Sequence, residues 1–307
     1  MCSIERNFYA LVAAIALFFA AAFAEAAEIE PRSFSNTPIG IHFLIAGYAY
    51  SQGGLSTVAS SPIEDAELKM NTEVLAFAQT LDVWGKSAKF DVILPYSHLS
   101  GTARNAGRRV ERNINGLNDP LFRFSWNFYG APALSLQEFS QYKQDLIIGG
   151  SIQISPPLGQ YDSDKLVNLG ANRWFVKPVL GVSKELGPWT LEVSAGAFLF
   201  TDNDDYFKGN TLEQDPVYTS QLHVTYNFGQ GVWAAISGTY DYGGQTTLNG
   251  VEKDDRQSNL RFGATLSLPI NKNNSIKLYA SSGVATRIGN DYDLLGAAWQ
   301  YRWGSGL

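Results

Sequence analysis

Near the end of the chain lies Leu294-Leu295-Gly296-Ala297-Ala298-Trp299-Gln300-Tyr301-Arg302-Trp303, and this stretch decides the fold. Every second residue from Leu295 to Trp303 is apolar or aromatic. The positions between them include Gly296, Gln300 and Arg302. Successive side chains of a strand point to opposite faces, so the alternation predicts a β-strand with one apolar and one polar face.

The same pattern recurs about a dozen times along the chain, each time followed by a turn or a polar loop. We therefore predict an all-β protein, a transmembrane antiparallel up-and-down β-barrel of about 12 strands whose apolar faces meet lipid. On the first strand the apolar face is expected to carry Ile41, Phe43 and Ile45. The expected strands are 39–52, 69–83, 88–101, 117–129, 145–158, 173–186, 188–201, 216–228, 231–243, 257–270, 275–288 and 292–303.

The connections between these strands alternate in length. Tight turns are expected near 84–87, 186–188, 228–231 and 271–274, and long polar loops at 53–68, 202–215 and 243–256. Outer-membrane barrels have this habit, with the short turns facing the periplasm, whereas a soluble β-sandwich has no reason to keep it. The connection 130–144 is long where a short one is expected, and we predict a short amphipathic helix over 133–139.

Aromatic residues at the strand ends favour the membrane barrel over a soluble secreted β protein. They include Trp84, Trp174, Trp189, Trp233 and Trp299. In membrane barrels such residues form girdles at the two lipid–water interfaces. A soluble sandwich remains the alternative fold.

The first 26 residues have the layout of a secretory signal peptide. An apolar run from 11 to 23 follows Arg6 and precedes small residues at 24–27, where cleavage is expected. The domains predicted are thus a signal peptide over 1–26 and the barrel over 27–307. Cys2 is the single cysteine and lies before the apolar run, so the exported chain is expected to have no thiol, disulfide or cysteine-bound metal.

Composition limits the range of partners. The formal net charge is −6, which argues against nucleic acid. Charged residues make up 17% and aromatic residues 13% of the chain, values that fit a barrel whose residues half face lipid. The expected location is the bacterial outer membrane, reached through the periplasm.

Several motifs along the chain resemble those of the MetA-pathway of phenol degradation family. They are Gly116-Leu117-Asn118-Asp119-Pro120, Ser155-Pro156-Pro157-Leu158-Gly159-Gln160-Tyr161, Asn172-Arg173-Trp174 with Lys177-Pro178, Phe200-Thr201-Asp202-Asn203-Asp204-Asp205, Gln214-Asp215-Pro216 and Leu278-Tyr279-Ala280. The resemblance implies an outer-membrane transporter that helps aromatic compounds cross. It implies no catalytic or binding residue, and the closing strand is similar to the signal that barrel-assembly machinery recognises.

The inward, polar face of the strands carries the functional hypothesis. The side chains expected to line the lumen are Arg123, Lys177, Glu192, Arg261, Lys277, Arg302, Gln300, Phe198 and Phe200, beside Gln153, Tyr48, Tyr50, His42 and His223. A barrel of about twelve strands is wide enough to pass a small solute. Phe198 and Phe200 on that face would give an aromatic or hydrophobic solute places to bind. The predicted function is a porin-like channel for passive diffusion of such solutes, needing no cofactor.

Other functions are open alternatives. A mixed-charge lumen can also cross-link into a plug, which would make a purely structural barrel. His98 with Ser100 on one face is the candidate for a lipid hydrolase at the rim. The aspartates at 202, 204 and 205 could hold calcium, and the arginines at 104, 108, 109 and 112 could bind lipopolysaccharide phosphates. For these charged loops a solvated surface is the simpler interpretation.

Overall fold

The structure is a computed structural model that describes residues 29–56, 63–105 and 108–305. The signal peptide predicted over 1–26, with Cys2, lies outside the described residues. Within the described part of the chain, no helix is long and apolar enough to cross a membrane.

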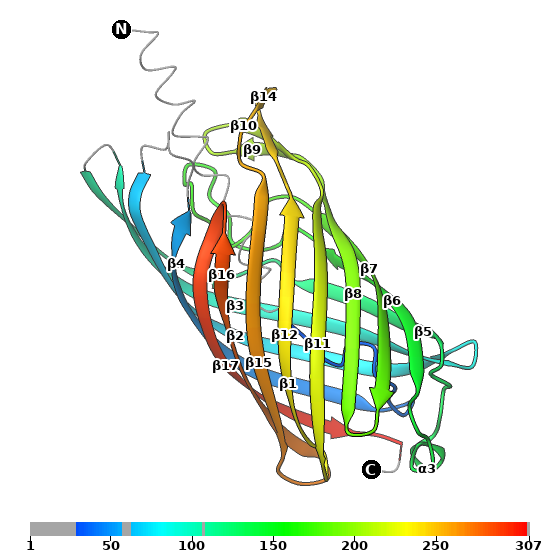
Figure 1. The fold of residues 1–307 in the computed structure, drawn as a ribbon. Coiled ribbons are helices and arrows are strands. Elements are labelled where there is room, and N and C mark those ends of the chain that lie inside the picture. The colour runs from blue at the N-terminus through cyan, green and yellow to red at the C-terminus, as the bar shows by residue number, and fades with distance from the viewer. Residues whose placement is uncertain (1–28, 57–62, 106–107, 306–307) are drawn as a thin grey trace, which may run out of the picture.

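The molecule is built from one large antiparallel sheet and one small sheet (Figure 1). The strands of the large sheet are β1 (His42–Ser56), β2 (Ile63–Val83), β3 (Lys86–Asn105), β4 (Arg108–Leu117), β5 (Leu121–Tyr129), β6 (Leu146–Ser155), β7 (Phe175–Leu186), β8 (Trp189–Phe200), β11 (Val217–Gly229), β12 (Val232–Gly243), β15 (Gln257–Pro269), β16 (Asn274–Thr286) and β17 (Gly289–Trp303). The small sheet consists of β9 (Asn203–Tyr206), β10 (Asn210–Gln214), β13 (Thr246–Leu248) and β14 (Val251–Glu252).

The large sheet closes on itself as a barrel. β1 pairs with β17 on one side and with β2 on the other, and β2 also pairs with β3. β4 and β5 both pair with β3, one after the other along its length, and are separated by a break at Pro120, which has no N–H to donate. The 13 strands therefore occupy twelve positions in the wall, which confirms the predicted barrel.

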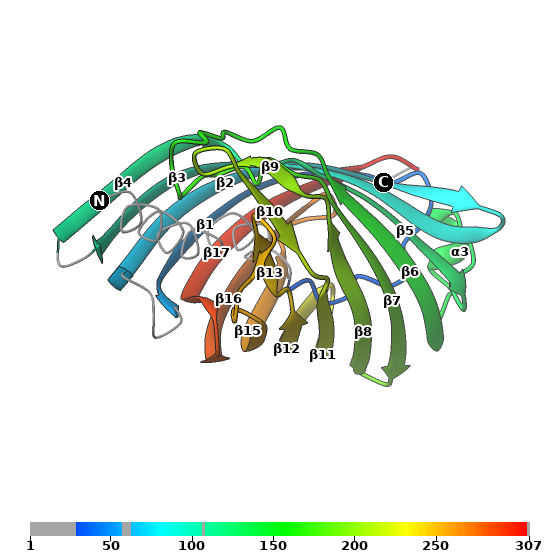
Figure 2. The ribbon, with the colours of Figure 1, turned by 90° about the horizontal axis from the view of Figure 1, so that it is seen from above.

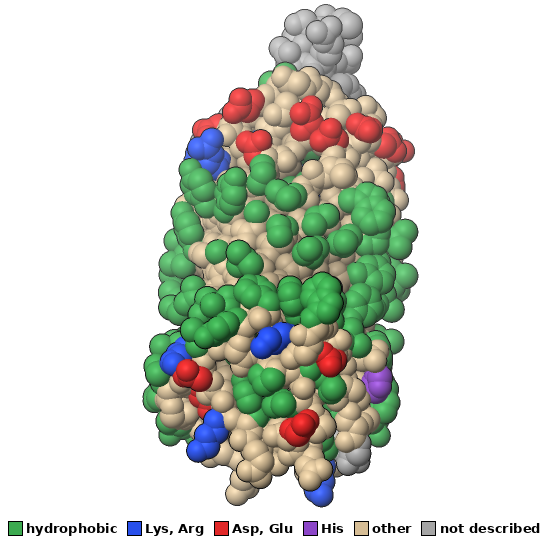
Figure 3. All heavy atoms as spheres, turned by 90° about the vertical axis from the view of Figure 1, so that its right-hand side faces the viewer, with side chains coloured by type: hydrophobic (Ala, Val, Ile, Leu, Met, Phe, Trp, Pro, Cys, Tyr) green, Lys and Arg blue, Asp and Glu red, His purple; other side chains and the backbone are tan. Residues whose placement is uncertain are grey.

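The outer surface of the barrel is apolar around its middle. Figure 3 shows hydrophobic side chains gathered in a band, with most charged side chains above and below it. Ile236, Leu180 and Leu295 are 68%, 67% and 66% exposed, values that only a lipid environment makes favourable for so many neighbouring strands. The protein is a bacterial outer-membrane β-barrel.

The short connections lie at one end of the barrel. The β2–β3 turn places Trp84 and Gly85 at φ 52° and 73°, the type I′ geometry that matches strand twist. The predicted helix in 130–144 is a single turn, α3 (Leu136–Phe139), capped by Ser135 and Glu138. Aromatic pairs ring this end, such as Trp189 with Tyr226 at 4.7 Å between centroids. We take this end as the periplasmic one.

The first strand presents the opposite face from the one predicted. Ile41 is 2% exposed and Ile45 lines an interior cavity, whereas Tyr48 is 46% exposed on the outer face. Tyr50 lies on the same outer face as Tyr48, and the His42 ring stacks on the outer-face Trp303 at 5.4 Å. The prediction that Tyr48, Tyr50 and His42 face the lumen was therefore wrong, because β1 is apolar on both faces.

Trp233, expected in a girdle, instead faces the lumen. It is 8% exposed, and its ring lies beneath Arg32 and near Lys277.

The loops at the other end are more structured than their polar composition predicts. The small sheet formed by β9, β10, β13 and β14 lies at the end of the barrel opposite α3 (Figures 1 and 2). The arginine-rich segment expected to be a loop continues strands β3 and β4, with Arg104 paired opposite Arg109. Within it, Arg109 pairs with Glu111 at 3.0 Å and Arg112 donates to Val167 O at 3.1 Å.

Candidate functional site

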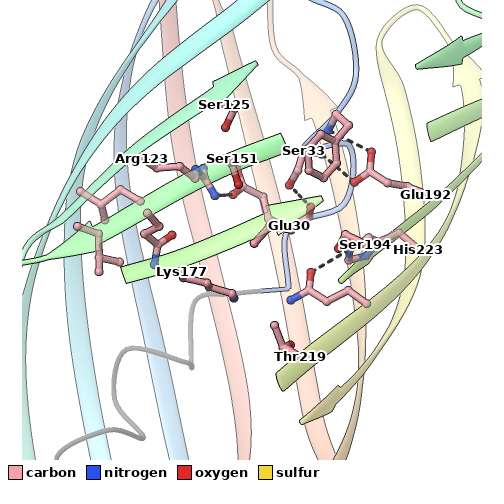
Figure 4. A pocket seen from close by; sticks show the side chains of 16 residues that line it. Glu30, Ser33, Arg123, Ser125, Ser151, Lys177, Glu192, Ser194, Thr219 and His223 are labelled. Atoms are coloured by element: carbon pink, nitrogen blue, oxygen red, sulfur yellow. Dashed lines mark hydrogen bonds and ion pairs between the residues drawn. The ribbon is translucent and has the colours of Figure 1, made fainter. Parts of the chain in front are cut away.

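The lumen is occupied by the segment that precedes the first strand, residues 29–41, here called the N-terminal segment. It forms no strand of the wall, and Glu30 and Ser33 lie inside the barrel among side chains from β5, β6, β7, β8 and β11 (Figure 4). Three groups of contacts hold it at mid-barrel, and further hydrogen bonds tether it at the periplasmic end.

The first contact is made by Glu192 of β8. Its two carboxylate oxygens accept hydrogen bonds from the backbone N–H groups of Ser33, at 3.0 Å, and Phe34, at 3.1 Å. Glu192 is 2% exposed, so these charge-assisted bonds are made out of contact with bulk water. A buried carboxylate on the wall thus recognises backbone of the N-terminal segment.

The second contact is an ion-pair network. Glu30 Oε2 lies 2.7 Å from Arg123 Nη1 of β5, and Arg123 Nε lies 2.8 Å from Asp91 Oδ2 of β3. Lys89 reaches the same Asp91 at 3.5 Å. The Arg123 guanidinium holds the pKa of Glu30 well below its usual range, so Glu30 is ionised at neutral pH.

The third contact is apolar and depends on two glycines. Phe34 is 3% exposed and lies over Gly149 of β6 and Gly181 of β7. A Cβ added at Gly149 would lie 2.7 Å from the Phe34 ring, and one added at Gly181 would lie 2.1 Å from it. Only glycine leaves room for the ring against this part of the wall.

At the periplasmic end, just before β1 begins, the N-terminal segment is hydrogen-bonded to Thr80 of β2. The Thr80 hydroxyl donates to Pro38 O at 2.6 Å and accepts from Ile41 N at 2.9 Å. Ile39 N donates to Leu134 O at 2.9 Å, next to α3. The segment is therefore tethered at the periplasmic end and docked by side chains at mid-barrel.

Two cavities flank the N-terminal segment. One of about 80 Å³ lies between Glu30 and the β5–β8 and β11 wall, with Lys177, Glu192 and His223 in its lining. The other, of about 220 Å³, lies between the segment and the opposite wall, with Trp233, Lys277 and Gln300 in its lining. Glu30 lines both. The lumen is thus hollow on either side of the segment.

Toward the extracellular end, three phenylalanines form an aromatic cluster: Phe175, Phe198 and Phe200. The Phe198 and Phe200 rings are stacked, 6.3 Å apart with an interplanar angle of 4°, and Phe175 lies edge-on to both. Lys177 Nζ lies 4.2 Å from the Phe198 centroid, and Arg173 Cζ lies 4.3 Å from the Phe200 centroid. A cation therefore lies on each side of the stacked rings, as cation–π attraction favours.

The extracellular mouth is built by sequence motifs that are far apart in the chain. The Asp119 carboxylate accepts from Gly159 N and from Ala171 N, both at 2.7 Å. Burial raises the pKa of Asp119, against the effect of these hydrogen bonds. Arg173 donates to Gln214. These hydrogen bonds bring four of the sequence motifs together at the extracellular mouth, namely 116–120, 155–161, 172–174 and 214–216.

The small sheet is fastened to the same place. Asn172 Nδ2 donates to Asn203 Oδ1 at 2.9 Å, and Asn203 Nδ2 donates to the Tyr161 hydroxyl at 3.1 Å. Tyr161 in turn donates to Asp205 O at 3.1 Å. The aspartates at 202, 204 and 205, which are the candidates for calcium, therefore belong to the mouth. Among the described residues, no group of three His, Cys, Asp or Glu side chains could hold a metal ion.

Comparison with known proteins gives a family and a fold. Residues 48–302 match the family described as MetA-pathway of phenol degradation. The chain belongs to this family. The solved structure of an outer membrane channel from Pseudomonas putida F1 is similar with a TM-score of 0.77 and 22% identity, covering 90% of this chain and 100% of that one.

A second solved structure is the β domain of the Bordetella autotransporter BrkA, with a TM-score of 0.49 and 11% identity, covering 86% of this chain and 100% of that one. No protein with curated annotation matches the chain.

In this member of the phenol degradation family, the residues predicted to line the lumen lie at three levels. Phe198 and Phe200 belong to the aromatic cluster, with Lys177 next to it. Arg123 and Glu192 hold the N-terminal segment, and Lys277 and Gln300 line the larger cavity. Arg261 and Arg302 lie apart from these groups: Arg261 lies over the Tyr292 ring at 3.6 Å, and Arg302 donates to Lys272 O in the β15–β16 turn at 2.8 Å.

The histidines fall into three different environments. His223 is 1% exposed, and its Nδ1 lies 2.7 Å from Ser237 Oγ on the neighbouring strand. His98 faces outward, 3.8 Å from Glu73. Across the described ranges of the chain His98 hydrogen-bonds no serine, so no Ser–His pair of a hydrolase is formed there.

Two functional features of this family member were missed at the sequence level. The N-terminal segment falls within the barrel domain predicted over 27–307, and no sequence pattern indicates that Glu30 and Phe34 lie in the lumen. The sequence indicates Arg173 only as part of the Asn172-Arg173-Trp174 motif, whereas its guanidinium lies over the Phe200 ring of the aromatic cluster. The signal that could have indicated the first feature is the pair of small residues, Gly149 and Gly181, on the inward face of adjacent strands.

Proposed function

We propose that this protein is a channel for small aromatic or hydrophobic solutes that cross the outer membrane by passive diffusion, and that the N-terminal segment closes the channel at rest. One observation carries the proposal: the segment lies across the lumen between two cavities but contributes no strand to the wall. Its release would break the bonds to Glu192 and Arg123 and leave the ladders between the wall strands intact.

The geometry supports an aromatic solute in particular. The aromatic cluster lies between the mouth and the smaller cavity, since Lys177 contacts Phe198 and also lines that cavity. On the other side of the N-terminal segment, Trp233 lines the larger cavity. Aromatic surfaces at successive levels would bind a flat apolar solute at several sites as it passes, and each site would hold it weakly enough to release it.

A second candidate function is a permanently plugged structural barrel. The Glu30–Arg123–Asp91 network favours it, because a buried, mutually satisfied ion-pair network resists opening. The two functions differ in whether the N-terminal segment can leave the lumen while the wall stays folded.

The test uses refolded protein in liposomes and planar bilayers. The wild-type chain is compared with a variant lacking residues 29–36, which carry the contacts to Glu192 and Arg123. For a channel we expect rare openings and slow uptake of phenol or toluene in the wild type, and a large increase of both in the deletion variant. No conductance and no uptake in either protein would overturn the channel and support the structural barrel.

A further inference from the structure

At the extracellular mouth, two buried hydrogen-bond donors have no partner among the residues that the structure describes. Arg173 is 3% exposed; its Nη2 donates to Gln214, whereas its Nη1 has no partner. Tyr206 of β9 is 2% exposed, and its hydroxyl has no partner either. A buried donor left unpaired is costly, and most such groups in folded proteins are paired by protein, water or ligand.

The two unpaired groups lie in the same part of the mouth. Tyr206 ends the four-residue strand β9, and Asn203 at the start of that strand accepts a hydrogen bond from Asn172 Nδ2, next to Arg173 in the chain, at 2.9 Å. The two oxygens of Asp119 accept from Gly159 N and Ala171 N. This part of the mouth therefore holds a guanidinium N–H and a phenol O–H that have no partner among the described residues.

The aromatic cluster lies directly beside these donors. The Arg173 guanidinium lies 4.3 Å from the centre of the Phe200 ring, and Phe200 is stacked on Phe198. Anything that pairs with Arg173 Nη1 thus has an apolar, flat surface next to it. The complementary ligand carries an anionic, planar acceptor group attached to an aromatic ring.

We propose that Arg173 and Tyr206 form a carboxylate-binding site at the extracellular mouth, and that the solutes the protein takes are single-ring aromatic acids. Arg173 Nη1 and the Tyr206 hydroxyl donate to the carboxylate, and the ring lies at the edge of the aromatic cluster, since Arg173 and Phe198 cover the faces of the Phe200 ring. Lys177, beyond Phe198, supplies the next positive charge toward the lumen. The proposal rests on the proposed channel function for its transport meaning, but the binding site itself can be tested without transport.

The experiment measures equilibrium binding to the full refolded chain in neutral detergent micelles. The probes are 4-fluorobenzoate, 4-fluorobenzyl alcohol and fluoroacetate, followed by ¹⁹F NMR. We expect 4-fluorobenzoate to bind at least about tenfold more tightly than the alcohol, which lacks the charge, and fluoroacetate, which lacks the ring, to bind weakly.

The decisive variant is Tyr206→Phe, because it removes only a hydroxyl that contacts no hydrogen-bond partner in the described part of the chain, so we expect the fold to stay intact. We expect it to lower the affinity for 4-fluorobenzoate about tenfold and to leave binding of the alcohol unchanged. The matched control is Tyr218→Phe on the lipid face, where Tyr218 is 58% exposed, and it should change neither affinity. Arg173→Lys keeps a positive charge without the planar fork and should also weaken benzoate binding.

Equal benzoate affinities for wild type and Tyr206→Phe would overturn the carboxylate site, and so would equal affinities for acid and alcohol. The outcomes for site and channel can be separated. Selective benzoate binding without flux through liposomes would overturn the channel function and retain the site. Flux of aromatic solutes with no preference for the acid would retain the channel function and overturn the carboxylate site.

Discussion

Replacing Phe34 by alanine tests whether the N-terminal segment is a separable closure. Phe34 is 3% exposed and lies in the hollow left by Gly149 and Gly181. Truncation of a buried phenylalanine to alanine costs about 3–5 kcal/mol. Because the segment forms none of the wall, we expect this loss to act on docking of the segment and to leave the stability of the barrel unchanged.

A loss of that size changes the ratio of undocked to docked segment by about 10²-fold to about 4 × 10³-fold, since about 1.4 kcal/mol corresponds to a factor of ten. The assay is single-channel recording in planar bilayers, with open probability as the readout. Heat denaturation followed by circular dichroism reports the stability of the barrel in parallel. We expect a large rise in open probability with an unchanged melting temperature.

The matched control is Phe262→Ala on the lipid face, where Phe262 is 48% exposed and lipid can fill the vacated space. It should change neither readout. If the open probability of Phe34→Ala stays within about threefold of the wild type, docking of the N-terminal segment does not close the channel. A fall in melting temperature would mean that Phe34 stabilises the wall itself, which also contradicts the separable segment.

Three further predictions concern single residues. Gly181→Ala places a Cβ 2.1 Å from the Phe34 ring, so it should displace the ring and raise the open probability although no residue of the N-terminal segment is substituted. An unchanged open probability in bilayer recordings would contradict this. Glu192→Gln leaves one amide donor facing a backbone N–H, so open probability should rise about tenfold or more, and a channel as closed as the wild type would count against the Glu192 contact. Burial lowers the pKa of Arg173 to about 10, against the opposing effects of Tyr206, Asp202, Tyr161 and Asp119. Because Arg173 loses its charge above that pH, binding of 4-fluorobenzoate should be lost as the pH rises through about 10. Binding of 4-fluorobenzyl alcohol should persist, and ¹⁹F NMR measures both.

The wall of the barrel could be predicted because its signal is local. Each strand alternates apolar and polar residues, and every predicted strand corresponds to a strand position in the wall. The prediction failed on β1, where residues 41–50 are apolar on both faces and alternation gives no direction. Trp233 was misplaced for a related reason: an aromatic residue near a strand end fits a girdle or a lumen equally well, and the choice depends on register with β15.

The position of the N-terminal segment and the structure of the mouth could not be predicted, because both depend on pairing between distant segments. Glu192 is predicted to line the lumen, but the sequence does not indicate its partners, which are backbone N–H groups of the N-terminal segment 159 and 158 residues away. In the small sheet, β10 pairs with β13, and both strands lie in polar stretches whose composition is typical of loops. Sequence alternation reports which face a residue takes, and it carries no information about which loop covers the opening.

The placement of charge relative to aromatic rings gives the lumen a direction. Arg173 and Lys177 lie at the two ends of the stacked Phe200–Phe198 pair, and Arg123 follows in the smaller cavity next to Lys177. An aromatic anion would meet a positive group at each of these levels, although the chain as a whole carries a net charge of −6. Glu30 interrupts the series only while the N-terminal segment is docked, since its carboxylate already pairs with Arg123. Undocking the segment would therefore both clear the lumen and leave Arg123 exposed to an incoming carboxylate, so an aromatic acid that reaches Arg123 would compete with Glu30 and favour the open state.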